Sequence, residues 1–328
     1  MINIAAPVID SEERRAVDEV IESGMLAQGP KVAELEESWA KYCGTKHALA
    51  VNSGTAAIHC ALYAAGVKEG DEVITTPYSF IATINPILML GARPVLVDID
   101  EETFNIDVSK IEAAITEKTK AIVPVDLYGQ PCDWAELQEI AKKHDLKIIE
   151  DACQAIGAEY KGIKAGALGD FGCFSLYATK NIMCGEGGIV TTNSDEASAA
   201  IRSFRQHGMV APYEYADLGY NYRMSDLHGA IAVEQLRKVD RFTAQRQRNA
   251  SLLNEALAGV KGIELPRVAD NRSHVYHQYT ILLDEGISRD EFVTKLREKG
   301  VGAGVYYPKP LHAYPHIAKL GYKVGDFP

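Results

Sequence analysis

The 328-residue sequence lacks the features that mark several large classes of protein. It has no apolar run long enough to span a membrane, and its first residues lack the basic and then apolar pattern of a secretory signal. Its net charge of -11 argues against nucleic acid or an anionic membrane as main partner, but is compatible with a local phosphate site. These absences predict a cytoplasmic globular protein with neither nucleic acid nor membrane as a partner.

Cysteine occurs six times but never as a CxxC pair or in a regular framework. Most of these residues lie within apolar stretches, which favours buried free thiols in a reducing cytoplasm over disulfides. Metal binding is the alternative, and the spacing gives it little support, so we expect no metal. The cysteines stand at positions 43, 60, 132, 153, 173 and 184.

Internal repeats and low-complexity segments are also absent, and the chain shows instead a regular alternation of strands and helices. Such alternation forms right-handed βαβ units, which predicts an α/β fold with a mostly parallel sheet. The strands are expected at 47–51, 72–76, 94–99, 121–127 and 146–151, and the helices at 10–23, 30–44, 56–65, 79–90, 107–116 and 132–144. Pro86 is expected to bend or interrupt the helix 79–90.

The last third of the sequence predicts a second, smaller α/β unit. Two successive helices carry the chain out of the large domain, so we place the domains at 1–238 and 239–328. The elements expected here are the helices 224–237, 239–258 and 288–299 and the strand-like segments 275–283 and 303–306.

Lys180 lies in the stretch FSLYATKNIMCGEGG (174–188), between an apolar segment that carries a serine and a glycine-rich turn. A surface cation whose stem lies along the protein is the usual interpretation of a lone lysine. Here the flanking segments are typical of interior strands, and clustered glycines let backbone approach something bulky. Partial burial lowers the pKa of a lysine and gives the free amine that Schiff-base chemistry requires.

Two further features fall at the carboxyl ends of predicted strands, where open α/β sheets bind ligands. The small polar turn 52–55 joins a strand to a helix and directs helix-terminal N–H groups at an anion, although an ordinary capped helix is the alternative. Asp151 directly follows the strand LKIIE, and by itself it would be interpreted as a helix cap. An amine, a buried carboxylate and a phosphate-cradling turn are together what pyridoxal 5′-phosphate (PLP) needs.

Five segments resemble the signature segments of the DegT/DnrJ-type sugar-nucleotide aminotransferases, which belong to the aspartate aminotransferase superfamily. The resemblance covers nearly the whole chain, from residue 7 to 328, and implies PLP fold type I and a homodimer with shared active sites. Because family members usually continue beyond GlyAspPhePro (325–328), it also implies that the small domain is truncated. The segments are NSGTAAIHCAL, EDACQAIGA, FSLYATKNIMCGEGG, RQHGM and GYNYRMSDLHGAIAVEQL.

The resemblance implies a role for each matching residue. Lys180 matches the Schiff-base lysine, and Asp151 matches the carboxylate that partners the pyridinium nitrogen, so these two are the expected catalytic residues. The other expected contacts with PLP are Gln154 near the ring hydroxyl, Phe80 stacked on the ring, Gly54, Thr55 and Ser175 around the phosphate, and Asn221 at the phosphate of the neighbouring subunit.

The reaction that the resemblance implies is transfer of an amino group from L-glutamate to a keto-sugar linked to UDP, GDP or dTDP, as in polysaccharide biosynthesis. Some superfamily members carry histidine at the lysine position and act as dehydratases, which Lys180 argues against. An amino-acid aminotransferase or lyase of the same fold, and a non-enzymatic regulator, remain the alternatives. Asp126 and Ile156 stand where the family often has histidine, and we expect both to face the sugar.

Basic and aromatic side chains elsewhere are candidates for contact with the nucleotide or the sugar. For Arg205 and Arg223 a structural ion pair is an equal alternative. The other candidates are His207, Tyr306 and His312.

Overall fold

The computed structural model describes residues 2–4 and 6–328, and its centre is a seven-stranded sheet of order β1-β9-β8-β5-β4-β2-β3. Only β9 runs against its neighbours, since it pairs antiparallel with both β1 and β8 while the other pairs are parallel. The prediction of an α/β fold with a mostly parallel mixed sheet is confirmed. The strands are β1 His47–Val51, β2 Glu72–Thr75, β3 Arg93–Leu96, β4 Thr119–Ile122, β5 Lys147–Asp151, β8 Phe171–Ser175 and β9 Gly188–Thr192.

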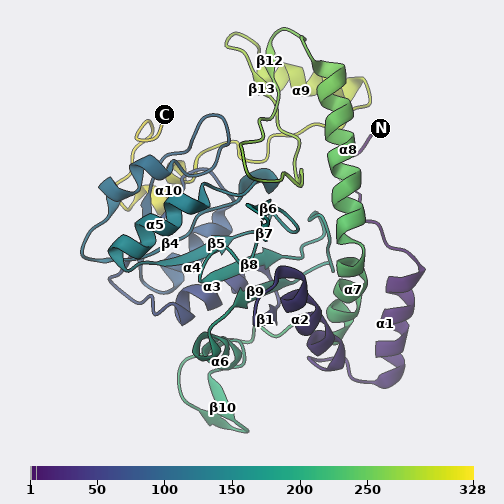
Figure 1. Ribbon diagram of the computed structural model, residues 1–328, viewed down its shortest axis with the longest axis vertical. Helices are drawn as coiled ribbons and strands as arrows, with labels where there is room; N and C mark the ends of the chain where they lie inside the picture. The colour runs from purple at the N-terminus through teal and green to yellow at the C-terminus, as the bar shows by residue number, and fades with distance from the viewer. Residues whose placement is uncertain (1, 5) are drawn as a thin grey trace.

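Helices cover both faces of this sheet (Figure 1). Side chains alternate along β1, so they reach both faces of the sheet. On the first face Leu49 and Val51 pack in the core that includes α3 and α6, and on the second face Ala48 and Ala50 pack in the core under α2 and α7. The helix α5 covers the part of that second face formed by β2, β4 and β5. The helices are α2 Pro30–Cys43, α3 Gly54–Ala64, α4 Asn85–Met89, α5 Trp134–His144, α6 Asp195–Phe204 and α7 Asp226–Arg237.

Beyond the sheet, the long helix α8 runs from the end of α7 towards a group of small C-terminal elements (Figure 1). The start of the chain returns to this group, where Ile2 forms a β-bridge with Val301. None of the helices among residues 2–4 and 6–328 is both long and apolar enough to cross a membrane. The remaining helices and paired strands are α1 Ser11–Ser23, α8 Val239–Leu257, α9 Arg289–Glu298, α10 Pro315–Ala318, β6 Glu159–Tyr160, β7 Ile163–Lys164, β10 Met209–Ala211, β11 Glu214–Tyr215, β12 Ile263–Glu264 and β13 Leu282–Leu283.

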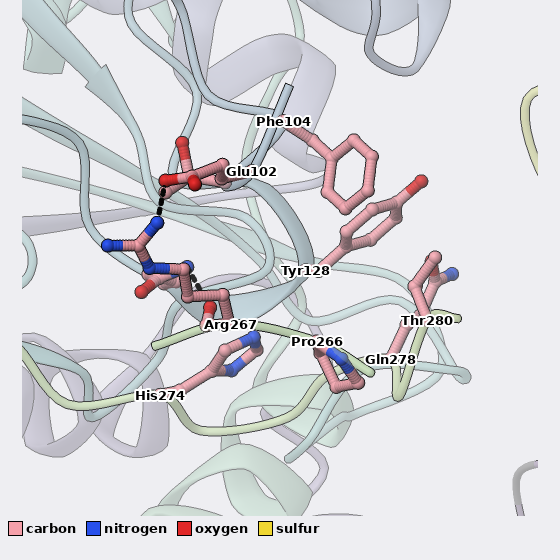
Figure 2. A pocket seen from close by; sticks show the side chains of 10 residues that line it. Glu102, Phe104, Tyr128, Pro266, Arg267, His274, Gln278 and Thr280 are labelled. Carbon is pink, nitrogen blue, oxygen red and sulfur yellow. Dashed lines mark hydrogen bonds and ion pairs between the residues drawn. The ribbon is translucent and has the colours of Figure 1, made fainter. Parts of the chain in front are cut away.

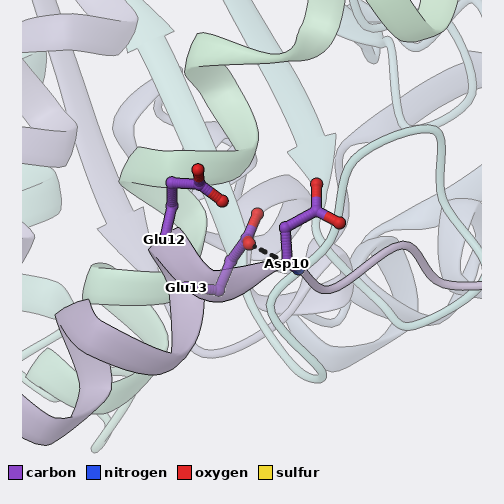
Figure 3. A group of neighbouring side chains, drawn as sticks. All are labelled: Asp10, Glu12 and Glu13. Atoms are coloured by element: carbon purple, nitrogen blue, oxygen red, sulfur yellow. Dashed lines mark hydrogen bonds between the residues drawn. The ribbon is translucent and has the colours of Figure 1, made fainter.

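Three carboxylates gather at the start of α1, those of Asp10, Glu12 and Glu13 (Figure 3). Asp10 and Glu13 form the capping box of the helix. The ammonium of Lys238 lies 2.7 Å from Glu13 Oε1, 3.1 Å from Asp10 Oδ2 and 3.5 Å from Glu12 Oε2. The cluster therefore serves to attach α1 to the junction of α7 and α8, and a lysine already supplies its positive charge.

Two of the expected helices are shorter or divided in the structure. The helix expected over 107–116 is a pair of 3-10 turns, Val108–Lys110 and Glu112–Ala114, because the Asp107 carboxylate accepts the Ser109 N–H and favours a local turn. The helix expected over 79–90 is divided at Ile84 into a 3-10 turn and α4, with Pro86 in the first turn of α4.

The strand-like segments of the C-terminal part are also shorter than predicted. Of 275–283 only Leu282–Leu283 forms a strand, because Tyr276 adopts a φ of 47° and the N–H groups of Val275 and Gln278 donate to Gly129 and Tyr128 instead of to a strand. The segment 303–306 forms no strand.

Asp226 connects two helices through its carboxylate. It lies in the first turn of α7, is 2% exposed, and accepts hydrogen bonds from Gly29 N at 2.8 Å, Lys31 N at 3.1 Å and Val32 N at 2.9 Å. The N-cap residue of α2, Gly29, has no side chain to accept these N–H groups, so Asp226 caps the helix from outside.

We therefore expect Asp226→Ala to lower the free energy of unfolding by about 3 kcal/mol, since it leaves one buried and two partly buried N–H groups without their acceptor. Denaturant unfolding followed by circular dichroism measures this value. As the matched control, Asp18→Ala on the exposed face of α1 should change it by less than about 0.5 kcal/mol. Equal effects from the two substitutions would contradict the capping role.

Candidate active site

The amino end of α3 forms one wall of the candidate site, at the carboxyl end of β1. Ser53 is the N-cap, and its hydroxyl accepts the N–H of Ala56 at 3.1 Å, so α3 begins at Gly54 and not at residue 56 as predicted. This places the N–H groups of Gly54 and Thr55 in the first turn, where helices bind anions.

Gly54 brings this helix into close contact with two strand ends. A Cβ atom at Gly54 would lie 2.8 Å from Ser175 Cβ and 3.1 Å from Cys153 Sγ, which is too close for any larger residue without a shift. The ends of β5 and β8 therefore meet the amino end of α3, and the Ser175 hydroxyl lies beside that helix end.

Asp151 ends β5 and is held by two donors. It is 4% exposed; its Oδ2 accepts the Thr83 hydroxyl at 2.8 Å, and its Oδ1 accepts the Cys153 N–H at 3.2 Å. The Thr83 hydroxyl in turn lies 2.9 Å from that of Ser79, in the loop after β2. The carboxylate therefore caps no helix and is oriented by a neighbouring loop.

Lys180 lies in the turn between β8 and β9, where its N–H donates to Tyr177 O at 2.9 Å. It is half-buried, and within the described residues no carboxylate lies within ion-pair distance of its ammonium. Burial lowers its pKa from the ordinary value, while the Cys153 thiol and the Asp151 carboxylate act in the opposite direction. The structure thus gives Lys180 the property expected of a reactive amine.

Gln154 lies three residues beyond Asp151 and is fixed at both ends of its amide. Its Oε1 accepts the Tyr128 N–H at 2.9 Å, and its Nε2 donates to the Tyr307 hydroxyl at 2.8 Å. Tyr307 is one of a group of rings that also includes Tyr78 and Tyr128, whose hydroxyls lie 2.9 Å apart. The amide is therefore immobilised before any ligand binds.

A small pocket lies on the other side of Tyr128, between the 102–104 turn and the segment that follows residue 265 (Figure 2). An ion pair between Glu102 and Arg267 closes one side, and the rings of Phe104 and Tyr128 form another (Figure 2). Neither Lys180 nor Asp151 lines it. We interpret it as a seam between the two parts of the chain and not as the reaction centre.

Two predicted PLP contacts lie on the surface of the single chain. Phe80 is 61% exposed, at the start of the loop that carries Thr83. Asn221 is exposed as well, and its backbone oxygen accepts the Asn52 side-chain amide at 3.2 Å. The structure therefore brings Gly54, Asp151, Ser175 and Lys180 together and leaves Phe80 and Asn221 on the surface around them.

The structure corrects the expected sugar-side positions. Asp126 is fully buried and accepts the N–H of Cys132 at 2.8 Å and the indole N–H of Trp134 at 3.3 Å. Ile156 is 1% exposed within the core under α2 and α7. Neither side chain faces a substrate, because both lie in the protein interior.

Two of the basic candidates are also interior. Arg205 is 3% exposed, pairs with Glu36 at 2.5 Å and donates to Ala50 O at 2.6 Å, so its role is structural. His312 is 1% exposed, and its ring contacts that of Phe327 with 4.9 Å between centroids.

The six cysteines are all free. Only Cys153 is not buried, so the expectation of buried free thiols is confirmed for the other five.

Sequence reasoning missed two residues beside Lys180. Asn181 is buried, and its Oδ1 lies 3.1 Å from His277 Nδ1. His277 lies 97 positions beyond Lys180 (277 minus 180), in a segment that was expected to be a strand. No sequence signal distinguishes it from the other histidines.

The sequence matches the DegT/DnrJ/EryC1/StrS aminotransferase family over residues 7–328. The chain belongs to this family. It is 46% identical to the pleiotropic regulatory protein of Geobacillus stearothermophilus, over 97% of this chain and 85% of the relative. It is 42% identical to the GDP-perosamine synthase of Caulobacter vibrioides, over 97% of this chain and 87% of the relative.

A solved structure of GDP-4-keto-6-deoxymannose-3-dehydratase, which holds a trapped PLP-glutamate adduct, superposes with a TM-score of 0.92. It is 28% identical and is matched over 97% of this chain and 89% of its own. The likeness confirms fold type I, and PLP is the cofactor of the family's aminotransferases. The site fits this group, since the close approach at Gly54 forms a cradle and a half-buried amine lies beside a buried carboxylate.

Asp126 also affects how stability depends on pH, because it lies near the buried carboxyl of Glu150. Burial raises the pKa of Asp126 to about 6, and burial together with repulsion from Asp126 raises that of Glu150 well above its ordinary value. Glu150 accepts the N–H groups of Gly166 at 2.7 Å and Leu168 at 3.3 Å. A carboxyl with a raised folded-state pKa stabilises the fold below its unfolded pKa, and this contribution is lost as pH rises through the folded value.

We expect the Asp126→Asn variant to become more stable relative to the wild type as pH rises. Relative to the wild type, its free energy of unfolding should increase by about 2 kcal/mol between about pH 4 and pH 7, because the amide does not titrate. Denaturant unfolding at a series of pH values measures the difference, with Asp18→Asn as the exposed control. A difference that stays constant with pH would show that Asp126 does not titrate in this range.

Proposed function

We propose that this protein is a PLP-dependent aminotransferase that moves an amino group from L-glutamate to a keto-sugar linked to a nucleotide. The observation that carries the proposal is the half-buried Lys180 amine beside Asp151 at the amino end of α3, in a chain of the aminotransferase family. The likeness to GDP-perosamine synthase and to a dehydratase that acts on a GDP-linked keto-sugar supports a sugar nucleotide as acceptor.

In this proposal each residue of the site has one task. When bound, PLP supplies an electron-withdrawing ring that stabilises negative charge at the donor's α-carbon. The N–H groups of Gly54 and Thr55 and the Ser175 hydroxyl bind its phosphate. Asp151, oriented by Thr83, holds a proton at the ring nitrogen. Gln154 lies at the ring hydroxyl, and the exposed face of Phe80 covers the ring.

Lys180 moves the proton of the reaction. Because burial lowers its pKa, more of its Nζ is the free amine at neutral pH, and this amine takes the proton from the α-carbon of glutamate. The same atom would then deliver the proton to the cofactor carbon that is bonded to the transferred nitrogen. In the second half of the cycle the keto-sugar accepts the nitrogen, and Lys180 moves a proton in the reverse direction.

A homodimer with shared sites accounts for the exposed residues. Asn221 follows the projecting β10–β11 hairpin (Figure 1), where Tyr213 is 86% and Leu218 is 70% exposed. Coverage by a second subunit would bury these side chains and bring Asn221 to the phosphate of the partner's PLP. In this arrangement residues 1–238 bind PLP and 239–328 form the smaller domain, and the free thiols agree with a cytoplasmic location.

The first test is the absorbance spectrum of the protein loaded with PLP. We expect a band in the violet that moves to the near ultraviolet when L-glutamate is added, because the cofactor leaves Lys180 and takes up the amino group. L-Lysine serves as the control donor and should leave the band in place. A band that glutamate does not change would contradict the aminotransferase assignment and favour the regulator of the same fold.

Lys180→Ala tests the central residue directly. We expect the violet band to be lost and turnover to fall by about 10³-fold or more, since the same amine both anchors the cofactor and moves the proton. Lys164→Ala is the matched control, because Lys164 is also half-buried but pairs with Glu159 at 3.0 Å away from the site. Turnover of Lys180→Ala close to that of Lys164→Ala would overturn the assignment.

A further inference from the structure

The turn that carries Lys180 is joined to a segment far along the chain, residues 274–278. The side chain of Asn181 makes both connections: its Nδ2 donates to Val275 O at 3.2 Å, and its Oδ1 lies 3.1 Å from His277 Nδ1. An amide oxygen only accepts hydrogen bonds, so His277 Nδ1 carries the proton. His277 therefore donates to the residue next to Lys180.

Several contacts fix the segment 274–278 in place. Val275 N donates to Gly129 O at 2.9 Å, and a Cβ at Gly129 would lie 2.8 Å from Val275 Cγ2 and 3.0 Å from His277 N. Gly129 also has a φ of 105°, so both its backbone conformation and the close approach of this segment require glycine at this position. From the other side, Arg246 of α8 donates to Tyr276 O at 3.0 Å and His277 O at 3.3 Å.

The same segment also reaches the loop that orients Gln154. Gln278 N donates to Tyr128 O at 3.3 Å, while Tyr128 N donates to Gln154 Oε1 at 2.9 Å. The segment 274–278 is therefore hydrogen-bonded both to the turn that carries Lys180 and to the loop that binds Gln154, and it belongs to the part of the chain beyond the large sheet.

Burial and the charges around His277 favour one protonation state of its ring. Burial lowers the pKa of His277 well below its ordinary value, and the positive charges of Lys180 and Arg246 lower it further. The neutral ring is therefore favoured, and in it the Nδ1–H donates to the amide oxygen of Asn181.

From this geometry we infer that His277 is a positioning residue for Lys180. Through Asn181 it holds the turn after β8, and so it fixes the direction in which the amine points. The inference rests on the proposed role of Lys180. It assigns to the 274–278 segment a task in the reaction that its distance in sequence conceals.

The test compares three substitutions in the PLP-loaded protein. His277→Phe keeps a ring but removes the N–H donor, His277→Asn keeps an N–H near the Nδ1 position, and His312→Phe is the control for a buried histidine in the same part of the chain. We expect His277→Phe to lower kcat by about 10- to 100-fold with KM for glutamate nearly unchanged, because a misdirected amine slows proton transfer more than binding.

His277→Asn should restore most of the kcat that His277→Phe loses, and His312→Phe should leave it at the wild-type level. Should His277→Phe not fold, Asn181→Ser removes the same hydrogen bond from the other side and should lower kcat in the same way. Equal losses in His277→Phe and His277→Asn, or wild-type kcat in His277→Phe, would overturn the inference.

A second readout needs no cofactor and separates this inference from the proposed function. In the protein without PLP, an amine-reactive acylating reagent labels Lys180 at a rate that mass spectrometry follows, and above the pKa of the amine this rate reports its accessibility. We expect His277→Phe to raise the rate several-fold, with His277→Asn and His312→Phe at the wild-type rate. An unchanged rate in His277→Phe would contradict the inference, whereas failure of glutamate to change the wild-type spectrum would contradict only the proposed function.

Discussion

Burial of one amine beside one carboxylate is the constraint on which the rest of the structure depends. A lysine taken out of water loses part of its preference for the charged form, and the Cys153 thiol and the Asp151 carboxylate only partly restore it. To keep this arrangement, the chain must partly bury Lys180 without giving it an ion-pair partner. The sheet does this at its carboxyl edge, where β5, β8 and the amino end of α3 meet closely because residue 54 has no side chain.

Much of this was open to prediction from the sequence. The strands were found because apolar runs alternate with helices, and the glycines and serines at strand ends identify the edge where ligands bind. Lys180, Asp151 and the turn at Gly54 were singled out because each follows such a run, whereas Ser175 was implied by the resemblance to a known family. What the pattern alone did not supply was their proximity, which the resemblance of whole segments to a known family implied and the structure provides.

The parts that escaped prediction depend on hydrogen bonds that the apolar pattern does not reveal, some to backbone groups distant in sequence and some to a nearby side chain. The segment 275–283 has the composition of a strand, yet its N–H groups donate to the 128–129 turn and its backbone reverses at Tyr276. Asp107 favoured a local turn over a helix for a related reason, because its carboxylate accepts a nearby N–H. Hydrophobic periodicity is insensitive to both effects, since neither changes which residues are apolar.

The two adjacent acids of β5 show how strongly the strand period determines chemistry. Side chains alternate across a strand, so Glu150 and Asp151 point to opposite faces although they are neighbours in sequence. Asp151 meets a hydroxyl and an N–H in the site, whereas Glu150 meets the buried carboxyl of Asp126. Two ionised carboxylates so close together in the interior would be costly, and the raised pKa values keep that pair partly protonated. The strand period thus places the Asp151 carboxylate near Lys180, where it and the Cys153 thiol oppose the fall in the lysine pKa without cancelling it.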